Sequence, residues 1–237
     1  MNGTLRALRL ALPLFGWFAP TWNLAGQTVS ARGIMGAPKS SVRTAGVTER
    51  VGGWWGGVAV GFQTGQWTVS AEGTRGSLSS SGGGPVLDRD VGEVSLSGRY
   101  EFPSGLGPEL RYVARAFRSA AGYQRWNMVA VAVAGSHDLG HPAVRAFASV
   151  AYLPILSAAG GEPRPTGGLG SEVGLSVVPD QFPVAFTLGY RVERFYFPRS
   201  AARSEQFETL TLSAGVHVRR HAGRWALSGR GSGGGKE

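Results

Sequence analysis

The chain has 237 residues, a net charge of +9 at pH 7, 38 glycines and no cysteine. The absence of cysteine excludes disulfide, zinc-thiolate and cysteine-nucleophile chemistry. Arginine supplies nearly all of the positive charge, since Lys39 and Lys236 are the only lysines, and the arginines are scattered along the chain. A nucleic-acid-binding protein would instead cluster its basic residues among aromatic ones, so we expect no nucleic-acid partner.

The first residues have the features of an export signal. Arg6 and Arg9 form a positive segment, and the apolar run Leu10–Ala19 follows them. Small residues offer cleavage positions near 25 and near 31. We therefore interpret residues 1–31 as a signal peptide, which would place the mature protein beyond the inner membrane.

From Trp54 onward, large apolar residues alternate with small or polar ones, which is the period of a β-strand. In Gly57–Gly73 the alternation runs up to a hairpin turn at Thr64-Gly65 and resumes after it. Most of the expected strands exceed the ~5–6 residues usual in soluble proteins and match the ~9–11 that a tilted membrane strand needs. The expected strands are Trp54–Gln63, Gln66–Arg75, Val91–Phe102, Glu109–Arg118, Trp126–Ser136, Ala143–Leu153, Leu169–Val178, Val184–Tyr196 and Gln206–Val218.

The connections between these strands alternate in length, as in an outer-membrane barrel with tight periplasmic turns and longer external loops. The longer ones are Gly76–Asp90, Ser119–Arg125, Pro154–Gly168 and Phe197–Glu205. This alternation requires one more strand before Trp54, within Gln27–Val51. We predict an all-β, closed antiparallel up-and-down transmembrane β-barrel of about ten strands, with eight as the alternative. Its parts would be an N-terminal segment (32–53), the barrel (54–218) and a basic, glycine-rich tail (219–237) expected to be disordered.

The two faces of each strand differ in composition. One face carries large apolar residues, and the other carries Gly, Ala, Ser and Thr together with Glu and Arg, where a soluble protein would present many lysines and acidic residues. We therefore expect Val58, Val60, Phe62, Trp67 and Val69 to face lipid, while Gln66, Ser70 and Glu72 face the lumen. Paired charges would fill that lumen, because an unpaired buried charge is costly. The expected lumen set is Glu72, Glu93, Arg99, Glu101, Glu109, Arg111, Arg115, Arg145, Glu172, Arg191 and Glu193.

Aromatic and basic residues near strand ends suggest contacts with the membrane surface. The aromatic set is Trp54, Trp67, Tyr100, Phe102, Trp126, Tyr152, Phe195 and Tyr196. Three arginines, Arg75, Arg118 and Arg194, fall in the lipid-facing phase at strand ends, where we expect them to bind lipid A phosphates bidentately.

Over roughly Trp54–Val218 the chain resembles the small outer-membrane β-barrel proteins of Gram-negative bacteria. The resemblance lies in architecture, and the last strand departs from it because it ends "GVHVRR" without a terminal aromatic. The resemblance implies location in the outer membrane. It also implies contact with membrane lipid and lipopolysaccharide, and insertion by the outer-membrane assembly machinery.

The sequence shows no catalytic constellation. His137 and His141 are spaced i, i+4 but lie in a Pro/Gly turn, which disfavours a metal pair. Ser213 and His217 share a strand face, yet four residues of strand separate them by roughly 13 Å. We therefore predict a non-enzymatic barrel, without cofactor or metal, that has a structural or surface-interaction role and a lumen filled by side chains. The alternatives are a narrow porin-like channel, a soluble secreted lipid-binding barrel and an outer-membrane lipid hydrolase.

Overall fold

The computed structural model describes residues 27–44, 46–80, 88–120, 122–140, 143–160, 164–179, 183–221 and 224–227. Within them lie eleven strands and one short 3-10 helix, η1 (Arg199–Ala201). In the described part of the chain, no helix has the length and apolarity needed to cross a membrane. The strands are β1 (Thr28–Thr44), β2 (Val47–Thr64), β3 (Trp67–Ser80), β4 (Arg89–Tyr100), β5 (Leu106–Ser119), β6 (Gly122–Asp138), β7 (Val144–Ala159), β8 (Gly167–Val177), β9 (Val184–Tyr196), β10 (Arg203–His221) and β11 (Arg224–Leu227).

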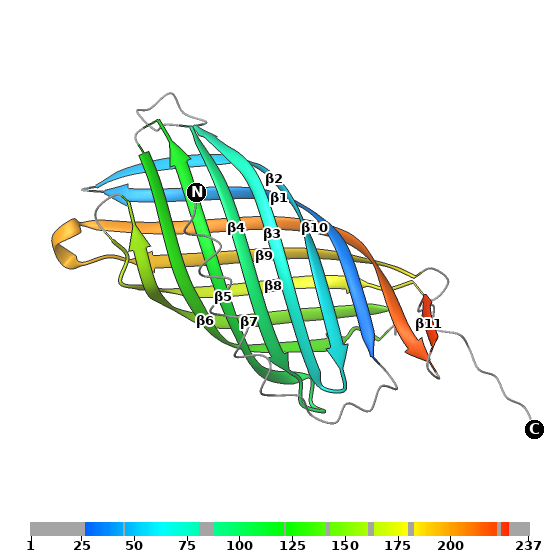
Figure 1. The fold of residues 1–237 in the computed structure, drawn as a ribbon. Coiled ribbons are helices and arrows are strands. Elements are labelled where there is room, and N and C mark those ends of the chain that lie inside the picture. The colour runs from blue at the N-terminus through cyan, green and yellow to red at the C-terminus, as the bar shows by residue number, and fades with distance from the viewer. Residues whose placement is uncertain are drawn as a thin grey trace, which may run out of the picture.

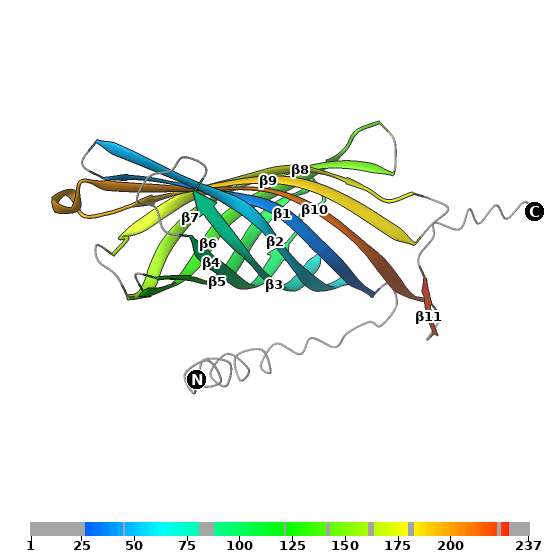
Figure 2. The same cartoon turned by 90° about the horizontal axis from the view of Figure 1, so that it is seen from above.

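The first ten strands form one closed antiparallel barrel. Each pairs with the next along the chain, and β10 pairs back onto β1, from Thr28 opposite Arg219 to Thr44 opposite Arg203. Figure 1 shows the tilted strands wrapping around a common axis, and Figure 2 shows the barrel from above, with β11 at one end. The prediction of a closed up-and-down barrel of ten strands is confirmed, and the eight-stranded alternative is wrong.

The barrel is longer in sequence than the expected range 54–218. Strand β1 lies inside Gln27–Val51, where a first strand was required, but it begins at Thr28. A cleavage near 31 would remove its first residues, whereas one near 25 would leave it whole; residues 1–26 lie outside the described part. At the other end β10 runs to His221, and β11 pairs with its last residues. Residues 219–221 and 224–227 are therefore strand rather than disordered tail, and residues 228–237 lie outside the described part.

The two ends of the barrel carry different connections. At one end, here called the turn end, the chain crosses at 65–66, 101–105, 139–143 and 178–183. At the other, the outer end, it crosses at 45–46, 81–88, 120–121, 160–166 and 197–202. The longest connections thus lie at the outer end, which makes it the external one. The predicted long connector Ser119–Arg125 is wrong, because β5 and β6 extend through most of it and meet in a two-residue hairpin.

The barrel exterior is apolar, as the strand phases predict. Val58, Val60 and Trp67 are 66%, 55% and 56% exposed, respectively, whereas Ala59, between the two valines, is buried. A soluble barrel would hold these large side chains inside, so that alternative does not fit the structure. Gln66 was expected to face the lumen, and this expectation is wrong. Gly65 and Gln66 form the β2–β3 turn, with Gly65 at φ +55°. Gln66 accepts a hydrogen bond from the exterior Tyr100 hydroxyl instead.

Two of the aromatic residues assigned to the membrane surface point inward instead. Trp126 and Phe195 are almost completely buried and belong to the hydrophobic cluster inside the barrel. Phe195 shares its strand phase with Arg191 and Glu193, so period two places all three on the lumen side. In β6 the small residues and Met128 share the inward phase with Trp126, while Val131 and Val133 face outward.

Candidate functional site: the barrel interior

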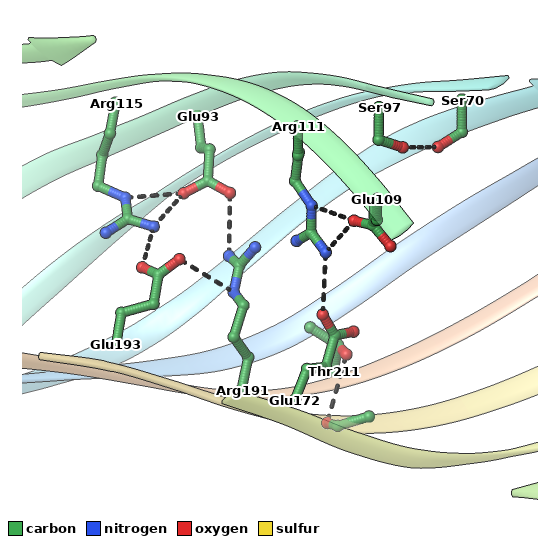
Figure 3. A network of polar contacts seen from close by, with 11 residues as sticks. Ser70, Glu93, Ser97, Glu109, Arg111, Arg115, Glu172, Arg191, Glu193 and Thr211 are labelled. Carbon is green, nitrogen blue, oxygen red and sulfur yellow. Dashed lines mark hydrogen bonds and ion pairs between the residues drawn. The ribbon is translucent and has the colours of Figure 1, made fainter. Parts of the chain in front are cut away.

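Four charged side chains form a ring inside the barrel, here called the charge ring: Glu93, Arg115, Arg191 and Glu193. Arg115 Nη2 lies 2.6 Å from Glu93 Oε2 and 2.5 Å from Glu193 Oε2. Arg191 Nη2 donates to Glu93 Oε1 at 2.9 Å, and its Nε lies 3.8 Å from Glu193 Oε1. Positive and negative groups therefore alternate around the ring, and each group contacts two of the opposite sign (Figure 3).

The charge ring spans the lumen from one wall to the other. Glu93 and Arg115 stand on the adjacent strands β4 and β5, whereas Arg191 and Glu193 stand on β9, which pairs only with β8 and β10. The contacts of Arg115 and Arg191 with carboxylates of the opposite wall therefore cross the interior. Arg115 is 0% exposed and Glu93 3% exposed, so the ring lies where the desolvation cost of a charge is high and pairing has to offset it.

An aromatic layer covers the charge ring on the side of the outer end. Its members are Trp55, Phe117, Trp126, Phe195 and Phe207, contributed by β2, β5, β6, β9 and β10. Their rings contact in a chain of tilted and edge-on pairs, with centroids 5.0–6.3 Å apart, which is the favourable arrangement for aromatic groups. The guanidinium of Arg115 lies 4.3 Å from the Phe207 ring centroid, so layer and ring are packed directly on each other.

Glycine makes room for one member of this layer. Gly36 on β1 pairs with Trp55, and a Cβ at that glycine would lie 2.1 Å from Trp55 Nε1. Any larger residue would displace the indole from the lumen. The packing has a cost, because Trp55 Nε1 has no hydrogen-bond partner among the described residues.

A third group, here called the outer cap, lies between the aromatic layer and the outer end of the barrel. It consists of Ser40, Arg89, Arg203 and Glu205. Arg203 Nη2 lies 3.1 Å from Glu205 Oε2, and Arg89 Nη2 donates to Ser40 Oγ at 2.7 Å. Ser40 in turn donates to Glu205 Oε1 at 3.3 Å. Sequence reasoning missed this group because it assigned residues 89, 203 and 205 to loops. The strands are longer than expected, and the inward phase of β4 and β10 includes all three.

The interior towards the turn end is also charged but less enclosed. Arg111 Nη2 lies 2.7 Å from Glu109 Oε1 and 3.5 Å from Glu172 Oε2, and Figure 3 shows the three side chains together. Nearer the turns, Arg99 pairs with Glu101 at 3.1 Å. Arg145 pairs with Asp138 at 2.9 Å and lies 4.0 Å from Glu101, with its own side chain 49% exposed. Solvent therefore reaches this half of the barrel, and its ion pairs are correspondingly weaker.

The structure brings together almost all of the residues assigned to the lumen from the sequence. Every member of that set except Glu72 lies within 4.0 Å of an opposite charge. Glu72 is partly buried on the inward face of β3, without an ion pair to any described residue. The contacts form separate groups along the axis rather than one continuous network.

The three rim arginines are exposed on the exterior but do not share one location. Arg75 and Arg118 lie on β3 and β5, on the same side of the barrel. Arg194 lies on β9, paired with Leu169 and Gln206. The lipid-phosphate assignment of these residues stays a prediction.

The residues considered for catalysis lie on the inward face of β10 and at the turn end of β6. Ser213 and His217 occupy inward positions of β10, and Ser213 is buried. Lipid substrates would approach the other face of that strand. His137 is exposed at the end of β6, and His141 lies outside the described residues. In the described residues no group of three or more His, Asp or Glu side chains could hold a metal ion.

Comparison with known proteins gives similarity of fold only. No protein-family model matches the sequence, and no curated protein matches it. Among solved structures, the translocator domain of the autotransporter NalP from Neisseria meningitidis is 15% identical, with a TM-score of 0.47, over 91% of this chain and 95% of that one. The outer membrane protease OmpT from Escherichia coli is 11% identical, with a TM-score of 0.45, over 84% and 98%. Neisserial surface protein A is 16% identical, with a TM-score of 0.37, over 78% and 96%.

The architecture itself defines the class. A closed antiparallel barrel satisfies every backbone group within its wall, and an apolar exterior matches lipid. Even-numbered barrels of this kind are the membrane-spanning proteins of bacterial outer membranes. This chain is a transmembrane β-barrel of that class, with a charged and aromatic interior.

Proposed function

We propose that this protein is a non-enzymatic outer-membrane barrel with a closed lumen, which acts as a structural or surface-interaction element rather than as a channel. The observation that carries the proposal is the stacking of the aromatic layer on the charge ring. Together they connect β2, β4, β5, β6, β9 and β10 across the interior. A barrel of eight to ten strands has an interior just wide enough for side chains, and here bulky ones fill it.

The outer cap supports a role at the cell surface. Arg89 is the first residue of β4 and Arg203 the first of β10, so both stand where external connections enter the wall. Their contacts with Ser40 and Glu205 join β1, β4 and β10 at that end. Rigid strand ends that hold variable connections are the usual basis for recognition by loops.

Planar-bilayer recording tests the closed lumen. The refolded protein is expected to show no steady ion conductance, because the buried rings of the aromatic layer occupy the lumen. The double variant Phe117→Ala/Phe207→Ala, which removes two rings of that layer, is expected to conduct or to flicker. A large, steady conductance of the unaltered protein would overturn the proposal in favour of the narrow channel.

Replacing the connections 81–87 and 161–163 tests the surface role. Each would be exchanged for a two-residue Asn-Gly turn, and intact cells that display the barrel would be tested for attachment to surfaces coated with extracellular-matrix protein. We expect attachment to fall while the heat-shift of the barrel on gels stays unchanged. Unchanged attachment would count against a surface role. We further expect the outer-membrane assembly machinery to be required for insertion.

A further inference from the structure

We infer that a groove on the exterior of β3–β6 is a binding site for a phosphorylated lipid of the outer leaflet. Its floor is formed by small residues that lie next to each other in the sheet: Gly92 pairs with Ala116, and Ala114 pairs with Val94. Arg75 pairs with Gly92 on one side, and Arg125 pairs with Ala116 on the other. One row across four strands therefore has an arginine at each end and almost no side-chain volume between them.

The groove has a polar side and an apolar side. Towards the outer end it is bordered by the paired residues Asp90, Arg118 and Tyr123. The exterior residues line a cavity of about 370 Å³, whose floor also includes atoms of the inward-facing Thr74, Val91, Glu93 and Arg115. Towards the membrane centre it is bordered by Val94, which is 58% exposed, and beyond it the lipid-facing Leu110 continues the apolar wall. An amphiphile with a charged head and a hydrocarbon chain matches this order of polar and apolar surface.

The charge of the groove is positive. Arg75 lies 3.9 Å from Asp90, and both side chains are largely exposed. Arg118 and Arg125 have no carboxylate within 4.0 Å among the described residues, and Arg125 donates instead to Asn127 Oδ1 at 3.3 Å. On the exterior, three guanidinium groups thus border the groove against one carboxylate, while Glu93 and Arg115 in its floor neutralise each other in the charge ring. Guanidinium matches phosphate geometrically and can bind it with two parallel hydrogen bonds.

Position in the membrane favours a lipid over a soluble anion. Arg118 directly follows Phe117 of the aromatic layer, so the groove lies in the outer half of the barrel. Arginine is tolerated on a lipid-facing barrel surface near the interface and not at the midplane. The phosphate would lie among Arg75, Arg118 and Arg125, with an acyl chain along Gly92, Ala114 and Val94. Arg194, on β9, takes no part in this site.

Binding of bisphosphorylated lipid A to the full-length refolded barrel in detergent tests the inference. The probes are lipid A, dephosphorylated lipid A and inorganic phosphate, and the readouts are native mass spectrometry and the rise in heat-shift temperature. We expect lipid A to bind and both other probes to bind at least about tenfold more weakly, since loss of one charge-assisted contact is enough for that factor.

Two variants remove the site in independent ways. The triple change Arg75→Gln/Arg118→Gln/Arg125→Gln removes the positive charge, and Gly92→Phe fills the groove without changing charge. A Cβ at Gly92 would have only Thr74 O within 4 Å, at 3.9 Å, so a side chain can start from this position without a clash with the barrel wall. Each variant should weaken lipid A binding about tenfold or more.

The matched control is Arg43→Gln/Arg50→Gln/Arg199→Gln, which removes three exposed arginines elsewhere that have no predicted contact with lipid phosphate. It should leave lipid A affinity within about twofold of the starting value, a change well below that expected from the loss of one charged contact.

Three results would each overturn the inference: an equal loss of affinity in the control, unaltered binding in both groove variants, or equal binding of dephosphorylated lipid A. The inference needs the membrane placement but not the closed lumen, so a conducting barrel that still binds lipid A would contradict only the proposed function.

Discussion

The outer and turn halves of the lumen contain the same kinds of charged residue in very different surroundings. In the outer half, the charge ring is covered by aromatic rings, and Arg115 is wholly buried. In the turn half, Arg145 and Asp138 pair at 2.9 Å, close to an ideal distance, yet both are about half exposed. By distance alone, the Arg115–Glu93 pair at 2.6 Å and the Arg145–Asp138 pair at 2.9 Å would be expected to contribute similarly to stability. The comparison shows that burial, not distance, decides how much stability depends on an ion pair.

The largest loss is expected from Phe207→Ala in the outer half. This ring contacts Trp55, Phe117 and the Arg115 guanidinium, and it is 1% exposed. The cavity left behind should lower the free energy of unfolding by about 4 kcal/mol. Denaturant unfolding of the refolded barrel, followed by gel mobility without boiling, measures this. A loss below about 1 kcal/mol would mean that the aromatic layer is not tightly packed.

Glu93→Gln should have the next largest effect, about 3 kcal/mol, because Arg115 and Arg191 both lose a buried charged partner. The double variant Glu93→Gln/Arg115→Met is the control. It removes one charge of each sign and leaves Arg191 with Glu193, so its loss should be smaller than the sum of the single losses. Simple additivity would show that the ring does not act as a unit.

Glu109→Gln transfers the same change to the turn half, where we expect a loss of about 1–2 kcal/mol. Arg111 keeps Glu172 at 3.5 Å, and solvent reaches the group. The same denaturant series, run in parallel with Glu93→Gln, makes the comparison direct. Equal losses for the two glutamates would remove the distinction between the halves.

Arg145→Gln should have the smallest effect, about 0–1 kcal/mol, because its pairs with Asp138 and Glu101 are near the turns and partly solvated. Raising the salt concentration should reduce even this difference, since exposed charges are screened while the charge ring is not. Unfolding at low and high salt checks the expectation. A loss that persists in high salt would place Arg145 in a more enclosed site than its exposure indicates.

Much of the fold could be read from period-two alternation, but the first strand could not. In β1 the exterior phase contains only Val29 and Met35 as large apolar residues, with Lys39 and Arg43 nearer the outer end. Pro38 lacks an N–H, and the β1–β2 pairing is interrupted between Gly36 and Lys39. Position in the chain and the need for an even strand number located this strand, because its composition did not.

The interior charges, too, could be predicted from the sequence only in part. Strand phase identifies Glu93, Arg115 and Glu193 as inward residues, because neighbouring positions on a strand face opposite sides. The outer cap was missed for a related reason: residues at 89, 203 and 205 have the inward phase, but strand ends are hard to place where the apolar alternation fades. A run of polar residues at the end of a strand resembles a loop in the sequence, and only its pairing with the neighbouring strand identifies it as part of the sheet.

The sequence by itself determined the strand periodicity, the barrel class and the side of the wall that most strand residues occupy, because all three follow from local backbone geometry and composition. It misplaced Gln66, Trp126 and Phe195, which lie in a turn or near strand ends, where the alternation is less regular. The tertiary structure decided which side chains meet. Arg115 contacts Glu193, 78 residues away, and Arg75 borders a groove with Arg125 from three strands further around. Those contacts depend on the register and closure of ten strands, which no local pattern encodes.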